Sequence, residues 1–396
     1  MNAPQQVLVI NAGSTSLKLS LIDCADNAVH ITAQHATTFP AASLDRHDYT
    51  TAAQKLLAVV EPQLAPQCLI AHRVVHGGDS LGRASRINHA SLTKMEALAT
   101  LAPLHQPPAL AVIRALQKQR PTAPMFAVFD TGLYRELPEV ARYYALPAEL
   151  AQEYGIRRYG FHGLAHRSLI EQYRAAGGQA RRLITLQLGG GCSATAFLDQ
   201  QVLDTSMGFS PAEGLMMATR CGRLDTSVVL HLLRHGWDAS RIEQLINHQA
   251  GLLGVSGLSS DMRVLLQSIA NGHAKAELAV DHFCQHLCQQ IGAFAASLGG
   301  LEALVFGGGI GFGSAEIRAR VCHQLAWLGL ELDQSLNTAN SDHDGQLSAA
   351  ESAVDIRCFD TAEAPVIARE ALAFLADEPV ESTSHTPNQS LSRRHG

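Results

Sequence analysis

Three arginine and histidine sites lie in glycine-rich segments that show no helical pattern. They are His72–Arg73 ahead of Gly77–Gly78, Arg157–Gly163 (RRYGFHG) and Thr219–Gly222 (TRCG). Glycine beside a cationic side chain lets a ligand and the backbone approach closely. A single arginine is most simply a solvated surface charge, but three in such settings favour a binding site for an anion. Phosphoryl transfer needs such a site, because the reactants must be held in line under positive charge.

Two stretches of the chain share one pattern, which is a strand, a glycine-containing turn and a second strand. Val7–Asp23 (VLVINAGSTSLKLSLID) and Leu183–Asp199 (LITLQLGGGCSATAFLD) align without gaps, which places Gly13 on Gly189. A turn of small residues can point several backbone N–H groups into one concavity that holds anionic oxygens. Because each turn opens about half of the chain, the repeat predicts two related α/β domains with a polyphosphate between them.

Strand and helix signals alternate along the chain, which favours an α/β architecture. The apolar run Met125–Phe129 predicts a strand, and Asp130 follows at its carboxyl end, where open α/β sheets place their chemistry. Leu301–Phe306 predicts another strand, which leads into the glycines of 307–311 and then a helix that Ser314 can cap. A strand, a glycine loop and a helix N-terminus together suit a phosphate or a ribose.

Two further helices are predicted in the second half of the chain. Pro211–Met217 is expected to be helical, and a long helix carries apolar residues from Leu278 to Leu298, where Gly299–Gly300 end it. The segment HFCQHLC at 282–288 raises the alternative of a zinc site. Its histidine pair and its cysteine pair lie roughly 200° apart around a helix, so they cannot share one tetrahedral ion. We expect an ordinary helix there.

Length and composition place limits on the class of protein. The 396 residues suggest about two domains. With a net charge of −6, the chain has no basic field that would favour nucleic acid. It shows neither the signature of a signal peptide nor an apolar run long enough to span a bilayer, so we expect a cytoplasmic protein. The eight cysteines form no framework and are expected to be reduced thiols.

The order and combination of several sequence blocks resemble the acetate kinase family, which belongs to the superfamily of sugar kinases, actin and the heat-shock chaperone ATPases. The blocks are VLVINAGSTSLK at 7–18, HRVVHGG at 72–78, LAPLHQPPAL at 101–110, FDTGLYRELP at 129–138, RRYGFHG at 157–163, DTSMGFSPAEGLMMATRCG at 204–222, GVSGLSSDMR at 254–263 and GGGIG at 307–311.

This resemblance implies an α/β fold with two related actin-like ATPase domains, a duplicated ribonuclease-H-like fold, and a cleft between them. The first domain would span 1–130 and be joined by the C-terminal helix at about 364–377. The second would span 131–363 and carry the nucleotide site and the dimer interface. Residues 378–396 are polar and are expected to be disordered. The resemblance also implies a homodimer.

The resemblance assigns the chemistry to four residues. Arg73 would bind the substrate carboxylate and then the acyl phosphate, while Arg220 and His162 would stabilise the transferring group. Asp130 occupies the family's acid/base position. Because a carboxylate nucleophile is already ionised, we favour an orienting role for Asp130 over proton removal. As an alternative, Asp130 is simply a turn residue before Gly132.

Further residues match the family's ligand sites. Asn11 and Glu363 would help to hold Mg²⁺, and Lys18 would contact the nucleotide phosphates. The pocket for the acyl methyl group would consist of Val75, Leu104 and Pro211. The nucleotide would be bound by Gln187, Leu188, Gly189, Gly190, Gly191, Asp261, Met262, Arg263, Gly309, Ile310, Gly311, Phe312 and Gly313. Local alternatives are a strand-edge lysine for Lys18 and plain core positions for Val75 and Leu104. The match at Glu363 is the weakest, because its alanine neighbours replace polar residues.

The chain departs from the family pattern mainly on the side of the phosphoryl donor. Gln187–Gly191 replaces His-Leu-Gly-Asn-Gly, and Gly309–Gly313 (GIGFG) replaces Gly-Ile-Gly-Glu-Asn. Cys221–Arg223 replaces Ser-Gly-Asp, Leu164–Ala165 replaces Thr-Ser, and Tyr134–Arg135 replaces His-Gln. Losing one side-chain hydrogen bond to a charged phosphate costs roughly 1.5–3 kcal/mol, or about 10- to 150-fold in binding. Such a loss is tolerable for an enzyme that uses ATP.

The sequence therefore predicts an acetate kinase, in which ATP and acetate with Mg²⁺ give ADP and acetyl phosphate reversibly. One alternative is an acyl kinase of the same family that prefers propionate or uses a donor other than ATP. A nucleotide-binding regulator or chaperone-like ATPase would need the phosphate turns, but not Arg73, His162 and a small acyl pocket. A non-catalytic paralogue is the third alternative, because of the altered loops at Gly190 and Phe312.

Overall fold

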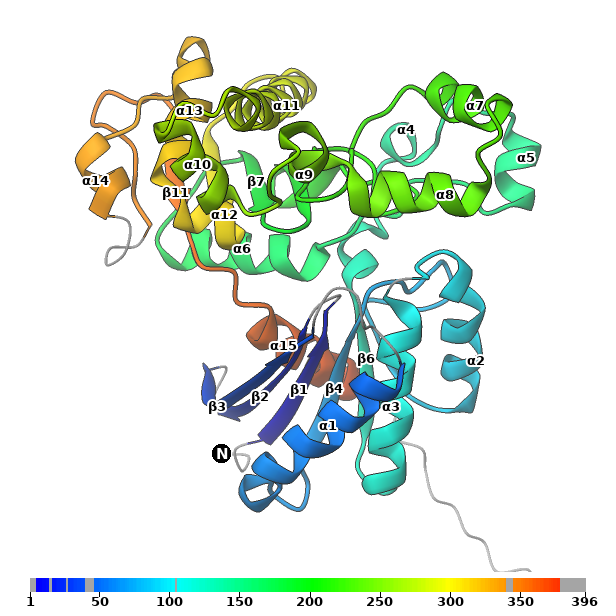
Figure 1. Ribbon diagram of the computed structural model, residues 1–396. Coiled ribbons are helices and arrows are strands. Elements are labelled where there is room, and N and C mark those ends of the chain that lie inside the picture. The colour runs from blue at the N-terminus through cyan, green and yellow to red at the C-terminus, as the bar shows by residue number, and fades with distance from the viewer. Residues whose placement is uncertain are drawn as a thin grey trace, which may run out of the picture.

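The computed structural model describes residues 5–13, 16–25, 28–39, 46–103, 105–339 and 345–377. In these ranges the chain forms two β-sheets, one from each half of the sequence, with helices packed around both (Figure 1). Leu104, the turn residues Ser14 and Thr15, and the tail 378–396 fall outside the described residues.

The first sheet has the strand order β3-β2-β1-β4-β6-β5. Its strands are β1 (Gln5–Ala12), β2 (Ser16–Ala25), β3 (Ala28–Thr38), β4 (Leu69–Val74), β5 (Ala84–Arg86) and β6 (Met125–Phe129). The strands β1, β2 and β3 form an antiparallel meander, while β1, β4 and β6 run parallel. The parallel strands therefore end at one edge, which brings Asn11, Arg73 and Asp130 to the same place.

The second sheet repeats this topology with the order β11-β10-β7-β8-β9. Its strands are β7 (Arg182–Leu188), β8 (Cys192–Leu198), β9 (Gln201–Thr205), β10 (Ala303–Gly307) and β11 (Asp355–Cys358). The turn after β1 has a Gly13 N–H bonded to the Ser16 carbonyl at 2.8 Å, and the turn after β7 has a Gly189 N–H bonded to the Gly191 carbonyl at 3.1 Å. The internal repeat predicted from the sequence is confirmed.

The alternation of side chains along β1 decides which helices cover which face of the first sheet. Leu8 and Ile10 point into a core shared with α1 (Arg46–Val60) and α3 (Gln106–Gln119). Val7 and Val9 point the other way, into a core that contains the apolar face of α15 (Glu363–Asp377). The last helix of the chain thus packs against the first sheet (Figure 1).

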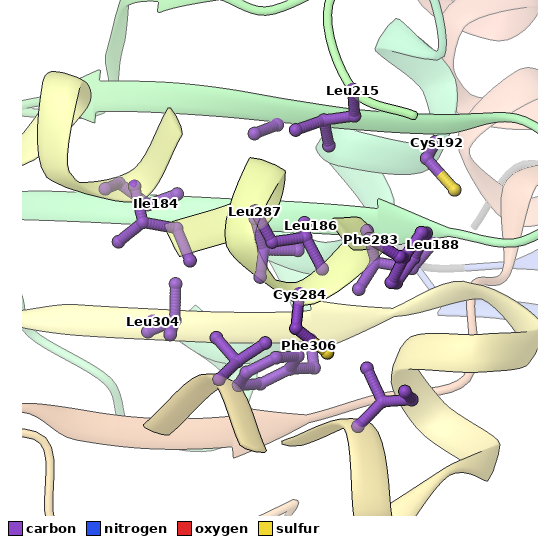
Figure 2. Close-up of a cluster of buried hydrophobic side chains, with 14 of the residues drawn as sticks. Ile184, Leu186, Leu188, Cys192, Leu215, Phe283, Cys284, Leu287, Leu304 and Phe306 are labelled. Atoms are coloured by element: carbon purple, nitrogen blue, oxygen red, sulfur yellow. The ribbon is translucent and has the colours of Figure 1, made fainter. Parts of the chain in front are cut away.

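The second sheet is covered by α11 (Ala274–Leu298) on one face and by α6 (Gly163–Ala175) on the other. Phe283, Cys284 and Leu287 of α11 pack on Ile184 and Leu186 of β7 (Figure 2). The helix ends at Gly299, with a φ of 70°, as the sequence predicted. The rings of His282 and His286 lie 4.4 Å apart between centroids, and the described residues contain no group of three or more potential metal ligands.

Shorter helices connect these layers. They are α2 (His89–Ala97), α4 (Glu139–Arg142), α5 (Ala148–Glu153), α7 (Thr226–Arg234), α8 (Ala239–Gln244), α9 (Gly251–Ser256), α10 (Met262–Ala270), α12 (Gly308–Gly313), α13 (Ala315–Gln324) and α14 (Gln334–Ala339), with 3₁₀ turns at Glu61–Gln63, Leu98–Thr100, Asp130–Tyr134 and Ala326–Leu328 and a π turn at Leu245–Gln249. No helix in the described ranges combines the length and apolar character that a membrane span requires.

Two local predictions differ from the structure. The segment Pro211–Met217 is an irregular turn rather than a helix, since Gly214 adopts a φ of 99° and lies so close to Ser206 that a Cβ would come within 2.3 Å of its carbonyl oxygen. The glycines after β10 were expected to form a loop, but Gly308–Gly313 forms a short helix of its own. Ser314 then caps α13 by accepting the Ile317 N–H, as predicted.

Candidate active site

Arg73 and Asp130 form the centre of the candidate site at the carboxyl edge of the first sheet. Arg73 is the fifth residue of β4 and Asp130 directly follows β6, which is parallel to it. The Arg73 Nε atom donates to Asp130 Oδ1 at 3.0 Å, and Nη2 donates to Oδ2 at 2.6 Å. This two-pronged contact fixes the plane of the guanidinium. Burial opposes the positive charge of Arg73, but Asp130 and Glu363 outweigh burial and raise the pKa of the group above its ordinary value.

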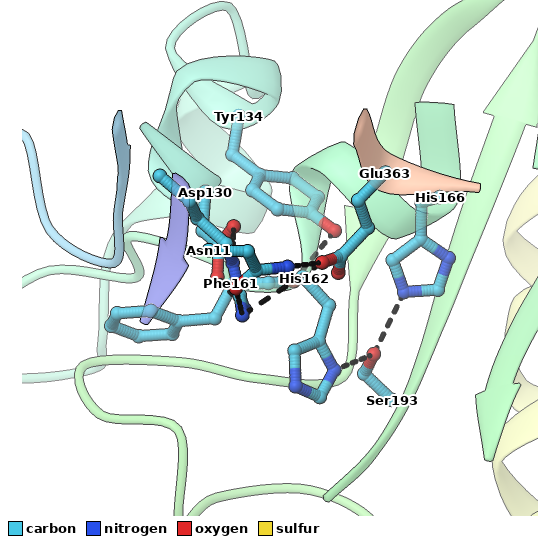
Figure 3. A network of polar contacts seen from close by, with 9 residues as sticks. Asn11, Asp130, Tyr134, Phe161, His162, His166, Ser193 and Glu363 are labelled. Atoms are coloured by element: carbon cyan, nitrogen blue, oxygen red, sulfur yellow. Dashed lines mark hydrogen bonds and ion pairs between the residues drawn. The ribbon is translucent and has the colours of Figure 1, made fainter. Parts of the chain in front are cut away.

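Asn11 and Glu363 lie beside this pair. Asn11 Oδ1 accepts from Arg73 Nη1 at 3.0 Å, and Asn11 Nδ2 donates to Glu363 Oε2 at 2.6 Å (Figure 3). Glu363 is the first residue of α15, where the helix dipole stabilises a carboxylate. One carboxylate and one amide oxygen form a sparse, hard-oxygen donor set. Such a set fits Mg²⁺, which usually keeps several waters and takes its other ligands from phosphates.

His162 stands at the start of α6 with a φ of 58°, in the left-handed region. The next residue must be glycine, because a Cβ on Gly163 would lie 2.2 Å from the Asp130 carbonyl oxygen. This close approach ties the start of α6 to the end of the first sheet. Burial, together with Arg73 and Arg220, lowers the pKa of His162 to about 3. The imidazole is therefore neutral at physiological pH.

Arg220 lies against the glycine turn that follows β7. A Cβ on Gly191 would be 3.1 Å from His162 Cε1 and 3.8 Å from Arg220 Nη1, so the three residues meet. Arg220 Nη1 donates to the Pro211 carbonyl at 3.4 Å, and no carboxylate in the described chain forms an ion pair with it. Burial lowers the pKa of this guanidinium. A partly buried arginine without an acidic partner, beside an open glycine turn, is suited to an anionic ligand.

Two of the three residues predicted for the acyl pocket, Val75 and Pro211, are within the described residues, and the pocket itself stays a prediction. Val75 is 5% exposed and shares a hydrophobic cluster with Tyr159 and Phe161. The edge of the His76 ring meets Tyr159 at a centroid distance of 4.5 Å. Pro211 is half-buried and connects to the site through the carbonyl that Arg220 binds. Leu104, the third predicted residue, lies outside the described residues.

Sequence reasoning missed two residues of this site, His105 and Phe161. His105 lies close enough to Arg220, Arg73 and His162 that they add to burial in lowering its pKa to about 3. The signal for His105 was its position in the block LAPLHQPPAL, directly after Leu104. Phe161 belongs to the same hydrophobic cluster as Val75. Its position directly before His162 was the sequence signal for it.

The predicted nucleotide segments of the second half are joined through one threonine. Gln187 Oε1 accepts from Thr361 Oγ1 at 2.8 Å, and the Gly308 N–H donates to the same hydroxyl at 3.0 Å. Gly308 has a φ of 75°, and a Cβ there would come within 2.5 Å of the Leu188 carbonyl oxygen. The turn Gly189–Gly191 and the first turn of α12 are thus held next to each other, with Gly190 exposed.

The remaining predicted nucleotide residues lie around the core of the second domain. Asp261 caps α10 and forms an ion pair of 2.6 Å with the exposed Arg263. Met262 is buried in the same hydrophobic cluster against which Ile310 and Phe312 pack. The starts of α10 and α12 therefore border one core. The nucleotide role of Asp261–Arg263 and of Gly309–Gly313 stays a prediction.

Lys18 faces Asn11 across the β1–β2 pair. Side chains directly opposite in an antiparallel pair lie on the same side of the sheet, with Cβ atoms about 4.5–5.5 Å apart. The Lys18 side chain is exposed, so its ammonium group can reach the same edge as Asn11. This position is compatible with the predicted contact to nucleotide phosphates.

Two sheets of matching topology, each with a glycine turn after its first strand, and the arginines and histidines beside those turns define an α/β phosphotransferase. The Acetokinase family model matches residues 6–369. The chain is 40% identical to an acetate kinase of Synechococcus sp. (strain JA-2-3B'a(2-13)), over 94% of this chain and 100% of that protein. The chain belongs to the acetokinase family.

Solved structures agree with this assignment. The acetate kinase of Porphyromonas gingivalis superposes with a TM-score of 0.81 at 31% identity, over 94% of this chain and 100% of that one. A propionate kinase from Francisella tularensis superposes with a TM-score of 0.81 at 33% identity, over 92% and 98% of the two chains. The predicted α/β fold with two related sheets is confirmed, and it is the fold of these acetate and propionate kinases.

Proposed function

We propose that this protein is an acetate kinase that transfers the γ-phosphoryl group of ATP to acetate, reversibly and with Mg²⁺. The observation that carries the proposal is the guanidinium of Arg73, which is held by Asp130 and Asn11 and lies two residues before the apolar Val75. A fixed cation close to an apolar side chain is suited to a short carboxylic acid. Arg220 and His162 lie across from it at a glycine turn that suits phosphate.

In this mechanism one acetate oxygen attacks the γ-phosphorus in line with the leaving ADP. Arg73 binds the carboxylate, and Arg220 and the neutral His162 face the oxygens on which charge is distributed in the transition state. Mg²⁺, held by Asn11 and Glu363, would neutralise charge on the β- and γ-phosphates. Both Asp130 oxygens accept hydrogen bonds from Arg73. Asp130 therefore orients that guanidinium, and no proton has to be removed from an ionised nucleophile.

Trapping of the product with hydroxylamine tests the proposal directly. Purified protein with acetate, ATP and Mg²⁺ should give acetyl hydroxamate, while omission of acetate or Mg²⁺ should give none. If folded protein yields no hydroxamate with ATP, the assay is repeated with pyrophosphate as the donor and with propionate as the acceptor. Product in either of those arms would replace this proposal with the corresponding acyl kinase.

A propionate preference is the second candidate, because the superposition on a propionate kinase is as good as that on an acetate kinase. The size of the pocket beside Val75 decides between the two acids. Competition of acetate and propionate at equal concentration, with both acyl phosphates quantified, gives the ratio of the two kcat/KM values. A ratio above one in favour of propionate would support this second candidate.

The domain division and the location belong to the same proposal. We place the boundary after residue 130 and assign α15 to the first domain, since its buried face completes the core that contains Val7 and Val9. Limited proteolysis should first cut connections between the two sheets rather than within them. A cytoplasmic location fits an enzyme that uses ATP.

We also propose a homodimer, because α7 presents several exposed apolar residues. None of its nine residues is buried, although Val228, Val229, Leu230, Leu232 and Leu233 are apolar. Leu230 and Leu233 are 49% and 45% exposed. Monomers seldom expose contiguous apolar surface without a partner. Light scattering should give the mass of two chains, and Leu230→Glu should give one chain if α7 forms the interface.

A further inference from the structure

A chain of hydrogen bonds runs from the candidate site into the interior of the second domain. His162 Nδ1 lies 2.9 Å from Ser193 Oγ, and the same hydroxyl lies 2.7 Å from His166 Nε2 (Figure 3). The other ring nitrogen of His166, Nδ1, lies 2.7 Å from Thr185 Oγ1. The four residues come from α6, β8 and β7, so the chain joins the helix that carries His162 to the strands beside the phosphate turn.

The inner members of this chain are shielded from solvent. His166, Ser193 and Thr185 are all 0% exposed. Buried polar groups must find their hydrogen-bond partners within the protein. Burial also lowers the pKa of His166 well below its ordinary value, so this imidazole is neutral and has a single N–H. Each nitrogen in these hydrogen bonds is therefore a donor or an acceptor. Ser193 Oγ could accept from both histidines, but its own O–H would then have no acceptor among the contacts of the described residues.

Two arrangements of protons make all three hydrogen bonds and also give the Ser193 hydroxyl an acceptor. In the first, Thr185 donates to His166 Nδ1, His166 Nε2–H donates to Ser193, and Ser193 donates to His162 Nδ1. His162 then carries its proton on Nε2. In the second, every bond is reversed and His162 Nε2 has no proton. The first arrangement gives the site a donor, whereas the second gives it an acceptor.

The free nitrogen of His162 faces the predicted phosphate site. A Cβ on Gly191 would lie 3.3 Å from His162 Nε2, and Arg220 is on the same side of that turn. An anionic phosphoryl oxygen between Arg220 and Gly191 needs a donor from His162, and it cannot be bound by an acceptor. The ligand thus selects the first arrangement of the chain.

We propose that Thr185, Ser193 and His166 are positioning residues that hold His162 as the Nε2–H tautomer, so that a neutral imidazole donates to the transferring group. The nature of that group rests on the proposed function. A neutral donor is an advantage between Arg73 and Arg220, because a third cation would be repelled by both. These hydrogen bonds also hold the ring of His162, whose left-handed backbone conformation is otherwise unfavourable.

Substitutions of Ser193 and Thr185 test whether this chain of hydrogen bonds contributes to turnover. Ser193→Ala should lower kcat by about 10- to 100-fold, as loss of orienting partners does at other sites, with the KM values for acetate and ATP changed less than threefold. Thr185→Val keeps the shape of the side chain but removes the last donor, and it should lower kcat by a smaller factor. Thr185→Ser should restore it.

Thr205→Val is the matched control. Thr205 is a buried threonine of the same sheet whose hydroxyl contacts the Ala194 carbonyl and the Tyr134 side chain, and neither histidine. This variant should keep kcat within twofold, and the melting temperatures of all variants should be compared with it. A Ser193→Ala enzyme that retains wild-type kcat, or equal losses in Thr185→Val and Thr205→Val, would overturn the proposal.

A spectroscopic measurement tests the tautomer without relying on kinase activity. The protein is labelled with ¹⁵N-histidine, the His162 signals are assigned from a His162→Gln variant, and inorganic phosphate is the probe. Wild-type protein with phosphate should show His162 protonated on Nε2, and Ser193→Ala should show averaging over both tautomers. A His162 protonated on Nδ1 in the phosphate-bound wild type would overturn the proposal. If the protein made no acyl phosphate at all, the proposed function would fail while this measurement still decided the tautomer.

Discussion

The Asn11 amide donates to the Glu363 carboxylate at 2.6 Å, although the two residues are 352 positions apart in the chain. Asn11 lies near the end of the first strand, and Glu363 opens the last helix. The predicted Mg²⁺ site is therefore formed only when the end of the chain returns to its beginning. Neither residue is in a local motif for metal binding, and the pair is joined to Arg73 through the second Asn11 atom.

If Glu363 is a ligand of Mg²⁺, Glu363→Gln should raise the Mg²⁺ concentration for half-maximal activity. An outer-shell partner of a metal is worth about 10- to 100-fold in affinity, so a direct carboxylate ligand should cost at least tenfold. The measurement is initial rate against free Mg²⁺ at saturating acetate and nucleotide. Glu370→Gln, on the same helix but paired with Arg167, is the control. An unchanged Mg²⁺ dependence in Glu363→Gln would remove Glu363 from the metal site.

Arg220→Ala should reduce kcat by about 10³-fold, because an arginine that faces the transition-state charge in phosphoryl transfer contributes at least that much. Arg223→Ala removes an exposed arginine three residues further on, and it should leave kcat nearly unchanged. Both variants are assayed with hydroxylamine trapping. A loss of less than tenfold in Arg220→Ala would exclude Arg220 from the mechanism.

Val75→Ala should enlarge the acyl pocket and shift the ratio of kcat/KM for propionate over acetate upward by about tenfold, since one methylene in an apolar pocket is worth roughly 1–3 kcal/mol. Val74→Ala is a matched control. Val74 is also fully buried, but its side chain packs in the core of the first sheet with α1 and α3. Val74→Ala should lower stability and leave the ratio of kcat/KM for propionate over acetate unchanged. Equal ratios in the two variants would mean that Val75 is only a core residue.

The buried histidines predict a loss of stability in mild acid. Burial lowers the pKa of His72 to about 3 and of His76 to about 4, with Arg157 adding to the effect at His76. These folded-state values lie below the ordinary value of about 6.5, so the unfolded chain binds more protons. Stability is therefore complete above pH 6.5 and decreases as the pH falls toward 3–4. At pH 5.5 a histidine with a folded pKa of about 3 costs about 1.4 kcal/mol.

Urea unfolding at pH 7.5, 6.5 and 5.5 measures this effect. His72→Phe should make the free energy of unfolding depend less on pH, because His72 Nε2 is buried and has no hydrogen-bond partner within the described residues. Phenylalanine fills similar space without a titrating group. A free energy of unfolding that stays constant from pH 7.5 to 5.5 would contradict the buried, neutral state of these histidines.

The sequence could predict features that depend on neighbours along the chain. The two glycine turns, the strand that ends at Asp130 and the cap at Ser314 are all local patterns of side-chain period and turn chemistry. The helix expected at Pro211–Met217 was wrong, because the approach of Gly214 to Ser206 is a tertiary contact that no local pattern reveals.

The assembly of the site was predictable only through resemblance. Arg73 and Asp130 could be expected at one edge once both strands were placed, since parallel strands end together. The bond from His162 to Ser193 joins the start of a helix to a strand 31 positions away, and the environment of His105 depends on Arg73, Arg220 and His162, which come from both halves. Both follow from packing between elements rather than from composition or spacing.

Because α15 packs on the first sheet, the core of that sheet can be completed only after the end of the chain has been synthesised. Domains generally fold from the N-terminus as they leave the ribosome. Here the face of the first sheet formed by Val7, Val9 and Phe126 stays uncovered until Val366–Ala371 has been made. The strands of the second sheet are complete by Cys358, before that helix exists. The half of the protein that is synthesised first is thus the half that finishes folding last.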